Sequence, residues 1–480
     1  MIAKSWSVKD LENWDAKIRD KVEEFGLSCF PQEFEVCDHE QMLGYMAYHG
    51  MPGHYPHWSY GKSFEKLKTL YSYGVSGLPY EMVINSNPAL AYLMQDNSLC
   101  LQVLTIAHVY GHNDFFKNNF TFRDTHPELT IARAKLRADR VRNYIEDSSI
   151  GLNQVEQTLD AAHALAMQCR RHTAIRKLSR EEQKAQALEN AKPPTDPFER
   201  IHKPKAHETP DLHRIPLEPE EDILLFIAEN NPYMSEWQRD LLHIVHEETQ
   251  YFIPQIETKI MNEGWASYWH HRIMNSIDLP EDLYIEFLVH HNQVIRPHPG
   301  SINPYHLGFK VWQDILRRHS DIPPGEGPEA DIAPPFDDSG LKKLFEVRET
   351  DRDVSFLRRF LTMELMRELD LFEYEKEDDK LVVSQVSDDE NWENVKATLL
   401  KNVGMGTTPV IRITDADYMN NRVLYMTHEH DGRDLQMEYL EKTLGFVYQL
   451  WGRQVLMMTV INDKQVLFSY DSDGLSQFKK

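Results

Sequence analysis

The sequence has 480 residues, of which 41% are apolar, 27% charged and 11% aromatic, and this composition excludes a disordered or fibrous protein. Lysine and arginine number 52 against 76 aspartates and glutamates, so the formal net charge is −24. Such an acidic chain disfavours nucleic acid and anionic membranes as main partners, because both would repel it. The length is about twice what one hydrophobic core usually supports, so two or three domains are expected.

The N-terminal segment and the cysteines indicate the compartment. No apolar stretch resembling a signal peptide opens the chain, and apolar runs such as 223–228 are far shorter than the roughly 20 residues that span a bilayer. The cysteines show neither a CxxC motif nor a disulfide-like spacing; they are Cys29, Cys37, Cys100 and Cys169. We therefore expect a cytoplasmic protein with reduced thiols and no membrane span.

Hydrophobic periodicity predicts a mainly helical chain up to about residue 320. Apolar residues spaced three or four apart predict an amphipathic helix at 8–25, whereas prolines and glycines interrupt the aromatic stretch 49–61. Seven prolines among charged residues make 191–220 an extended excursion. Further helices are expected at 62–73, 88–118, 126–180, 221–229, 235–250, 254–276, 280–293 and 305–319.

The hydrophobic pattern of the sequence changes after a Pro/Gly/acid-rich stretch that begins at Asp321. Helical pattern then gives way to β-rich segments, with one helix at 433–451 between them. The expected strands are 381–386, 408–414, 422–427, 454–461 and 465–470, the last two joined by a hairpin turn. The predicted fold is mainly α: a large helical, zincin-like N-terminal domain at 1–320, a linker at 321–340, and a smaller α+β C-terminal domain at 341–480.

Two histidines at helical spacing suggest a metal site. His108 and His112 are four residues apart, so on a helix both imidazoles project from one face, as in zinc metalloproteases. In those enzymes a glutamate follows the first histidine and acts as the base, but Val109 stands here. An HxxxH spacing alone also arises from packing, so a second element is needed.

The segment Asn262-Glu-Gly-Trp-Ala266 resembles the Asn-Glu-Gly-aromatic-Ala element of zinc aminopeptidases, in which the glutamate is the third metal ligand. Glu263 would thus complete a His₂Glu set with His108 and His112, leaving an open position for water. Gly264 in a helix interior is expected to permit close approach of another helix, with the HxxxH helix as the natural neighbour.

A carboxylate elsewhere must replace the base that is missing at Val109. Glu247 is expected in this role, with Glu248 and His246 beside it as further catalytic residues. A closed site with His246 or His270 as a fourth ligand would instead favour a structural metal.

Two loops offer substrate contacts. The aromatic loop 49–61 either packs on the helices or caps the pocket, with His54 or His57 as a fourth ligand or proton donor. The loop 296–308 is either a substrate-binding loop or a helix-connecting turn. Its predicted substrate-binding residues are Arg296, His298, Asn303, Tyr305 and His306.

Long aromatic-rich motifs resemble the SpoVR family, the stage V sporulation protein R and its relatives in non-sporulating bacteria. The motifs are at 53–62, 80–88, 108–116, 246–252 and 262–269. The resemblance implies a bacterial cytoplasmic protein linked in spore formers to the peptidoglycan cortex. It also implies a stress-response module with a serine kinase and a von Willebrand-like partner.

Two functional hypotheses follow. The first is a hydrolase of amide or peptide-like bonds in peptidoglycan or stress-related metabolism, acting on a peptide-like or cell-wall-derived substrate. It would use one zinc ion or another divalent transition metal per chain. The alternative is a non-catalytic sporulation or stress-response factor that has a structural metal and acts through protein partners.

Overall fold

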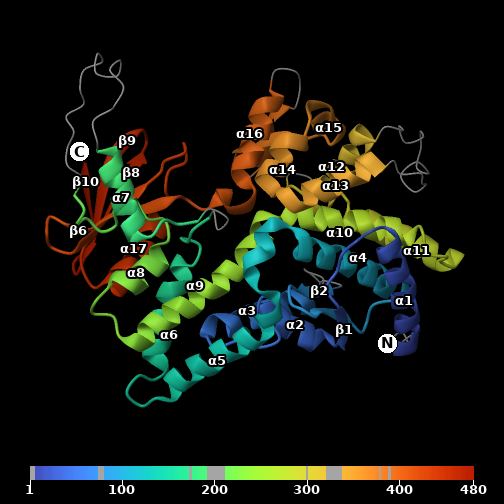
Figure 1. The fold of residues 1–480 in the computed structure, drawn as a ribbon, viewed down its shortest axis with the longest axis horizontal. Helices are drawn as coiled ribbons and strands as arrows, with labels where there is room; N and C mark the ends of the chain where they lie inside the picture. The colour runs from blue at the N-terminus through green and yellow to red at the C-terminus, as the bar shows by residue number, and fades with distance from the viewer. Residues whose placement is uncertain are drawn as a thin grey trace. The chain divides into compact units, whose positions relative to one another are not determined.

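The computed structural model describes residues 6–73, 81–171, 176–191, 211–298, 301–320, 338–377, 380–386 and 391–479 (Figure 1). They form a mainly helical protein with a small C-terminal sheet, as predicted. The chain divides into two compact units, each made of two stretches of sequence. Unit 1 comprises Met1–Arg142 and Tyr251–Thr407, and unit 2 comprises Asn143–Gln250 and Thr408–Lys480.

These units are discontinuous, whereas the sequence prediction placed consecutive domains at 1–320 and 341–480. Residues 338–407 thus belong to the same compact unit as the first helices of the chain. Residues 143–250 belong to the same unit as the C-terminal strands. Most of the predicted linker 321–340 and of the excursion 191–220 lies outside the described residues. Both therefore stay predictions.

Unit 1 is built mainly of helices. They are α1 (Val8–Glu24), α2 (His39–Ala47), α3 (Trp58–Ser72), α4 (Leu99–Asn118), α10 (Lys259–Met274), α11 (Glu281–Val294), α12 (Pro304–His319), α13 (Asp338–Thr350), α14 (Asp353–Phe360), α15 (Met363–Glu368) and α16 (Trp392–Asn402). Short 3-10 helices lie at η1 (Phe120–Thr125), η2 (Pro127–Leu129) and η4 (Gly404–Thr407). The helices α5 (Thr130–Glu146) and α9 (Glu236–Glu257) each contribute residues to both units.

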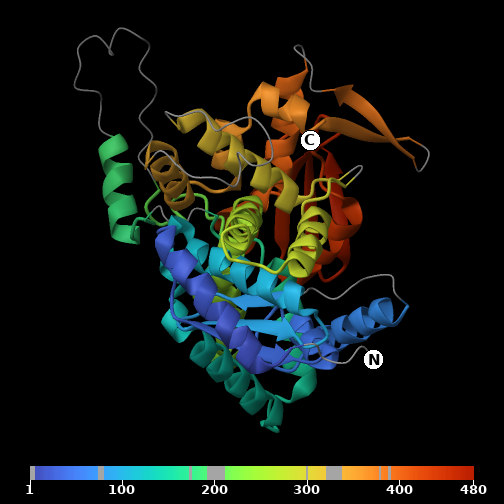
Figure 2. The ribbon, with the colours of Figure 1, turned by 90° about the vertical axis from the view of Figure 1, so that its right-hand side faces the viewer.

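Unit 1 also contains a three-stranded sheet that the sequence analysis missed. Its strands are β1 (Gln32–Cys37), β2 (Glu81–Ile84) and β3 (Ala89–Met94), in the order β1-β3-β2. β1 runs parallel to β3, and β2 runs antiparallel to it. The helix predicted at 88–118 is therefore wrong before Leu99, because the apolar run of β3 has no periodicity that separates a buried strand from a helix. A second pair of strands, β4 (Phe372–Glu377) and β5 (Lys380–Val386), forms an antiparallel hairpin, drawn as orange arrows in Figure 2.

The core of unit 1 forms around α10, which packs between α4 and α12 (Figure 1). Trp265, Trp269 and Trp312 are buried there. Glycines bring the helices together: a Cβ on Gly111 would lie 2.6 Å from the Cα of Ala266, which is closer than carbon atoms pack. The prediction that Gly264 permits close approach of another helix is confirmed, but that helix is α12 and not α4. The residue of α10 that faces α4 is Ala266.

Buried polar side chains fix the ends of these helices. Asp353 accepts hydrogen bonds from the backbone N–H groups of Ile260 and Met261, both at 2.9 Å, at the start of α10. These donors lack intrahelical partners, and a carboxylate at a helix N-terminus also complements the helix dipole. α10 is thus held at its start, one turn before Glu263.

Unit 2 combines helices with a five-stranded sheet. Its helices are α6 (Leu152–Leu165), α7 (Arg180–Asn190), α8 (Ile223–Asn230) and α17 (Met437–Trp451). Its strands are β6 (Ile411–Tyr418), β7 (Val423–His428), β8 (Val455–Ile461), β9 (Lys464–Asp471) and β10 (Gly474–Lys479). Their order is β10-β9-β8-β7-β6, and β7 and β8 are parallel because α17 connects them.

The strands predicted at 408–414, 422–427, 454–461 and 465–470 are confirmed as β6 to β9, and β10 was not predicted. Asn462 and Asp463 form the turn between β8 and β9, with φ angles of 49° and 60°. Positive φ at both positions matches the twist of a two-residue hairpin, for which asparagine and aspartate are suited. None of the helices in the described ranges is both long and apolar enough to cross a membrane.

Candidate functional site

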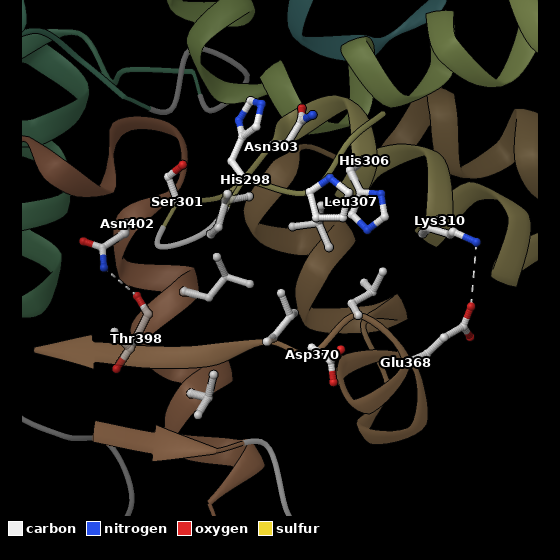
Figure 3. A pocket seen from close by; sticks show the side chains of 16 residues that line it. His298, Ser301, Asn303, His306, Leu307, Lys310, Glu368, Asp370, Thr398 and Asn402 are labelled. Atoms are coloured by element: carbon white, nitrogen blue, oxygen red, sulfur yellow. Dashed lines mark hydrogen bonds and ion pairs between the residues drawn. The ribbon is translucent and has the colours of Figure 1, made fainter. Parts of the chain in front are cut away.

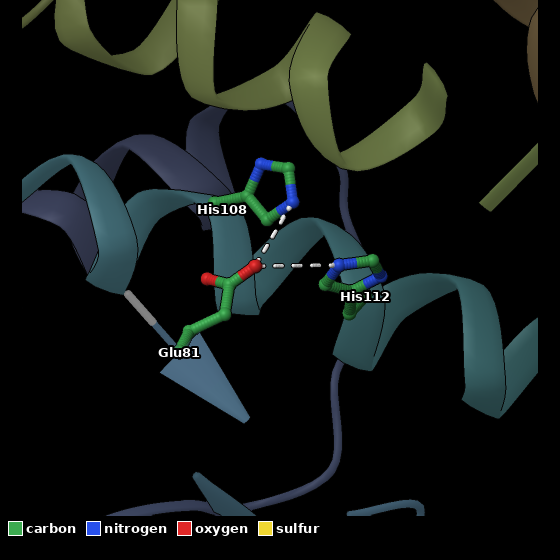
Figure 4. Close-up of side chains that lie close together, drawn as sticks. All are labelled: Glu81, His108 and His112. Carbon is green, nitrogen blue, oxygen red and sulfur yellow. Dashed lines mark ion pairs between the residues drawn. The ribbon is translucent and has the colours of Figure 1, made fainter. Parts of the chain in front are cut away.

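The HxxxH spacing lies on α4, a helix buried along most of its length. Ser98 caps its N-terminus by accepting a hydrogen bond from the backbone N–H of Leu101. His108 and His112 project from one face of this helix, as predicted, and both are buried. Figure 4 shows the two imidazoles turned toward the carboxylate of Glu81.

Glu81, the first residue of β2, brings a carboxylate to both histidines. Its Oε1 lies 3.2 Å from Nε2 of His108 and 3.8 Å from Nε2 of His112. The three donor atoms all lie within 4.8 Å of one another. The cluster of Glu81, His108 and His112 could therefore hold a metal ion.

Glu263, the ligand predicted from sequence, approaches the same two imidazoles from α10. Its Oε2 lies 3.5 Å from Nε2 of His112 and 4.0 Å from Nε2 of His108. Tyr305, at the start of α12, lies beside Glu263, whose charge raises the pKa of the tyrosine. The side chains of Glu81, Glu263 and His112 are 10%, 16% and 8% exposed, while that of His108 is 0% exposed.

Burial and mutual repulsion dominate the electrostatics of the cluster. Burial and, to a smaller extent, the charge of Glu263 raise the pKa of Glu81 to about 7 against the opposing effect of His112. Burial alone would lower the pKa of His112, but the nearby carboxylates of Glu81 and Glu263 and the hydrogen bond to Asn262 raise it to about 9. Burial lowers the pKa of His108 well below its usual value. The Oε2 atoms of both glutamates are buried without a hydrogen-bond partner among the described residues.

A second layer of side chains orients the two histidines. Nδ1 of His112 lies 2.9 Å from Oδ1 of Asn262, which can only accept a hydrogen bond. Nδ1 of His108 lies 2.7 Å from Nδ1 of His270. In each histidine, therefore, the ring nitrogen facing away from Glu81 is occupied and Nε2 faces the cluster, as in metal sites with oriented imidazoles.

The aromatic loop 49–61 gives its histidines contacts of their own. His57 is the N-cap of α3, and its Nδ1 accepts a hydrogen bond from the backbone N–H of Ser59 at 3.3 Å. Nε2 of His54 lies 3.3 Å from the hydroxyl of Tyr60, and the two rings are in contact. These contacts account for the local structure, and the substrate-binding role of both histidines stays a prediction.

The predicted loop 296–308 divides between two places. Tyr305 lies at the cluster, whereas His298, Asn303 and His306 line a separate cavity of about 640 Å³ between α12, α15 and α16 (Figure 3). Its walls include leucines, and Lys310 forms an ion pair with Glu368 at its edge. Asn303 also caps α12, accepting a hydrogen bond from the N–H of Tyr305. Arg296 is exposed.

The predicted catalytic residues on α9 belong to unit 2, whereas the cluster belongs to unit 1. Nε2 of His246 lies 2.8 Å from Oδ2 of Asp222, the N-cap of α8. Glu247 is exposed and Glu248 is half-buried. The structure thus gives His246 a partner in its own unit, and the roles of the two glutamates stay predictions.

Glu81 is the residue that the sequence analysis missed. It lies far from the other donors in sequence and belongs to a strand that was not predicted. Two signals accompany it: it opens the short apolar segment Met82-Val-Ile84, and it falls within the motif at 80–88. A search for carboxylates at the ends of short strands could have found it.

The fold and the cluster define a mainly helical protein with a buried His/Glu group that could hold a metal. The family described as "SpoVR like protein" matches residues 5–408, and "SpoVR-like C-terminal domain" matches residues 409–462. The chain belongs to the SpoVR family, as its motifs predicted.

A curated relative matches along almost the whole chain. The chain is 33% identical over 476 residues to "Uncharacterized protein YcgB" of Escherichia coli (strain K12). The match covers 94% of this chain and 92% of that protein. No solved structure matches. The boundary between the two family matches lies within one residue of Thr407, where the second stretch of unit 1 ends.

Proposed function

We propose that unit 1 is a metal-dependent hydrolase of amide or peptide-like bonds, and that one divalent transition metal binds at Glu81, His108 and His112. The observation that supports this most is the convergence of two carboxylates and two oriented imidazoles from three elements in one buried place. Two imidazoles with a carboxylate form a donor set suited to catalytic zinc, which makes zinc the first choice.

The electrostatics of the cluster support a bound cation. Two carboxylates share a largely buried site, and neither Oε2 finds a hydrogen bond within the described part of the chain. The protonated His112 offsets only part of their charge, and an uncompensated buried charge costs on the order of several kcal/mol. A divalent cation would offset the repulsion between Glu81 and Glu263 and use the lone pairs at Nε2 of both histidines.

The residues around the cluster would take different catalytic roles. When bound, the metal would supply a water molecule with a lowered pKa. Glu263, farther from His108 than Glu81 is, would accept the proton of that water, replacing the base absent at Val109. Tyr305 would donate its hydroxyl proton in a hydrogen bond to a substrate oxygen. Glu247 is the alternative base.

The proposed substrate is a peptide-like or cell-wall-derived molecule in the cytoplasm, as expected from the zinc-peptidase motif at 262–266 and from the link of the family to peptidoglycan. Small exposed fractions at Glu81 and Glu263 favour access by a slender chain over access by a folded protein. His54, His57, Arg296, His298, Asn303 and His306 are proposed as more distant substrate contacts.

A second function is favoured by the number of donors. If Glu263 also ligates the metal, four protein donors close the site, which is the pattern of a structural metal. The chain would then be a non-catalytic factor acting through partners, such as the serine kinase and the von Willebrand-like protein that the family resemblance implies.

Elemental analysis of protein purified without a metal-affinity tag tests the site. We expect close to one zinc or similar metal per chain in the wild type, and loss of that metal in His112→Ala. His271→Ala, at a half-buried histidine on α10, is the matched control and should keep the metal. Assays on synthetic peptides and peptidoglycan fragments then separate the two functions. A fully loaded protein that cleaves none of them would favour the structural metal.

A further inference from the structure

Three buried histidines form a hydrogen-bonded chain that leads away from the cluster. Nδ1 of His108 lies 2.7 Å from Nδ1 of His270, and Nε2 of His270 lies 2.8 Å from Nδ1 of His291. The three rings come from α4, α10 and α11, and their exposed fractions are 0%, 0% and 4%. Both separations are those of good hydrogen bonds.

Each nitrogen–nitrogen contact in this chain requires one N–H group and one lone pair. A neutral imidazole carries a single N–H, so the state of one ring determines the next. If Nε2 of His108 offers its lone pair to a metal, its Nδ1 carries the proton and donates to His270. His270 then carries its own proton on Nε2 and donates to His291.

We propose that His270 and His291 are positioning residues that hold His108 in the tautomer and orientation needed to ligate the metal. This inference rests on the proposed metal site. His112 has an analogous partner in Asn262, whose side-chain oxygen can only accept. His270 differs because it can accept from His108 only while its other nitrogen donates to His291, so His291 supports His108 through His270.

The other tautomer of His108 is the one that the hydrogen-bonded histidines must disfavour. With the proton on Nε2, His108 would donate to Oε1 of Glu81, 3.2 Å away, and no lone pair would face the cluster. Removing the acceptor at position 270 favours this arrangement. Loss of an outer partner of a ligating histidine typically weakens metal affinity about 10- to 100-fold.

The affinity for zinc, measured by competition with a chromophoric chelator, tests the positioning role of His270 and His291. Variants of these residues should weaken binding to different extents. His270→Leu should weaken binding about 10- to 100-fold. His270→Gln should recover most of this loss, because the glutamine oxygen can still accept from His108. His291→Phe should have a smaller effect than His270→Leu. His271→Leu is the matched control, because His271 lies beside His270 on α10 and its ring centroid is 4.6 Å from that of His291.

The outcomes separate this inference from the proposed site. Unchanged affinity in His270→Leu, with binding lost in His112→Ala, would overturn the positioning role alone. A wild type that binds no zinc would overturn the metal site and the inference together. Histidine ¹⁵N spectra of zinc-loaded wild type give a readout that needs no variant to fold. They should show His108 protonated at Nδ1 and His270 at Nε2; His270 protonated at Nδ1 would contradict the proposal.

Discussion

Gly264 and Gly308 meet backbone to backbone: a Cβ on Gly308 would lie 2.7 Å from the Cα of Gly264. The same Cβ would also overlap the carbonyl oxygen of Ile260. Because these neighbours are backbone atoms, a side-chain rotation cannot relieve the overlap. The contact sets the spacing between α10, which carries Glu263, and α12, which carries Tyr305.

Gly308→Ala should therefore destabilise unit 1. Overpacking usually costs about 1–3 kcal/mol, and the upper end is expected here because backbone must move. Chemical denaturation measures the change in the free energy of unfolding. Gly61→Ala, in an exposed turn of α3 with nothing within 4 Å of its new Cβ, is the control and should be neutral or stabilise by up to about 1 kcal/mol. Equal losses in both variants would argue against the close contact.

Asp114→Ala should destabilise the fold without touching the cluster. Asp114 accepts hydrogen bonds from Nη1 of Arg348 at 2.7 and 2.8 Å, and from the indole N–H of Trp265 at 2.9 Å. Removing the carboxylate leaves the buried guanidinium with only the half-exposed Glu349 as a charged partner, at a cost of about 3–5 kcal/mol.

The control for this variant is Asp139→Ala, which removes an exposed ion pair with Arg142 and should cost at most about 1 kcal/mol. The folded fraction of Asp114→Ala should bind zinc as the wild type does. A variant that unfolds like the wild type but loses metal would instead make Asp114 part of the site.

Zinc affinity should rise with pH. In the metal-free protein the pKa of His112 is raised to about 9, so at neutral pH the imidazole holds a proton that the metal must displace. Below pH 9 the affinity should fall about tenfold per pH unit for one displaced proton, and more steeply below about 7, where Glu81 also takes a proton. Chelator competition between pH 6.5 and 8.5 measures the slope. An affinity that is flat across this range would contradict a role for His112 as a ligand.

Glutamine substitutions should separate ligand from base. Glu81→Gln should lower metal content, because it removes a ligand charge. Glu263→Gln should keep the metal and lower turnover at least ~10²-fold, the scale of a general base. Glu247→Gln is the comparison, and a loss of turnover there, but not in Glu263→Gln, would assign the base to α9. Loss of metal in Glu263→Gln would make it a fourth ligand and favour the structural role.

Much of the site followed from the sequence because its strongest signals are local. The spacing of His108 and His112 fixes their shared face on any helix, and the motif around Glu263 marked the third participant before the fold was known. The turn at Asn462 and Asp463 was equally local. Each of these features depends on residues within a few turns of the chain.

What the sequence did not give depends on distant segments. Glu81 reaches the histidines because β2 pairs with β3, which directly precedes α4, and no short-range pattern records this pairing. The neighbour of Gly264 was predicted wrongly, because helix contacts are decided by packing of whole faces. The discontinuous units have the same origin, since residues 143–250 interrupt unit 1 without a compositional boundary at either end.

The donors at the cluster come from a strand and two helices that only the folded chain brings together. An unfolded chain would offer a metal at most the local His108/His112 pair. Any metal bound here would therefore act as a thermodynamic clamp on unit 1, adding stability that grows with the logarithm of the free metal concentration. The amount of folded protein in a cell would then follow the metal supply. Scarcity of the metal would first cause faster degradation of the protein.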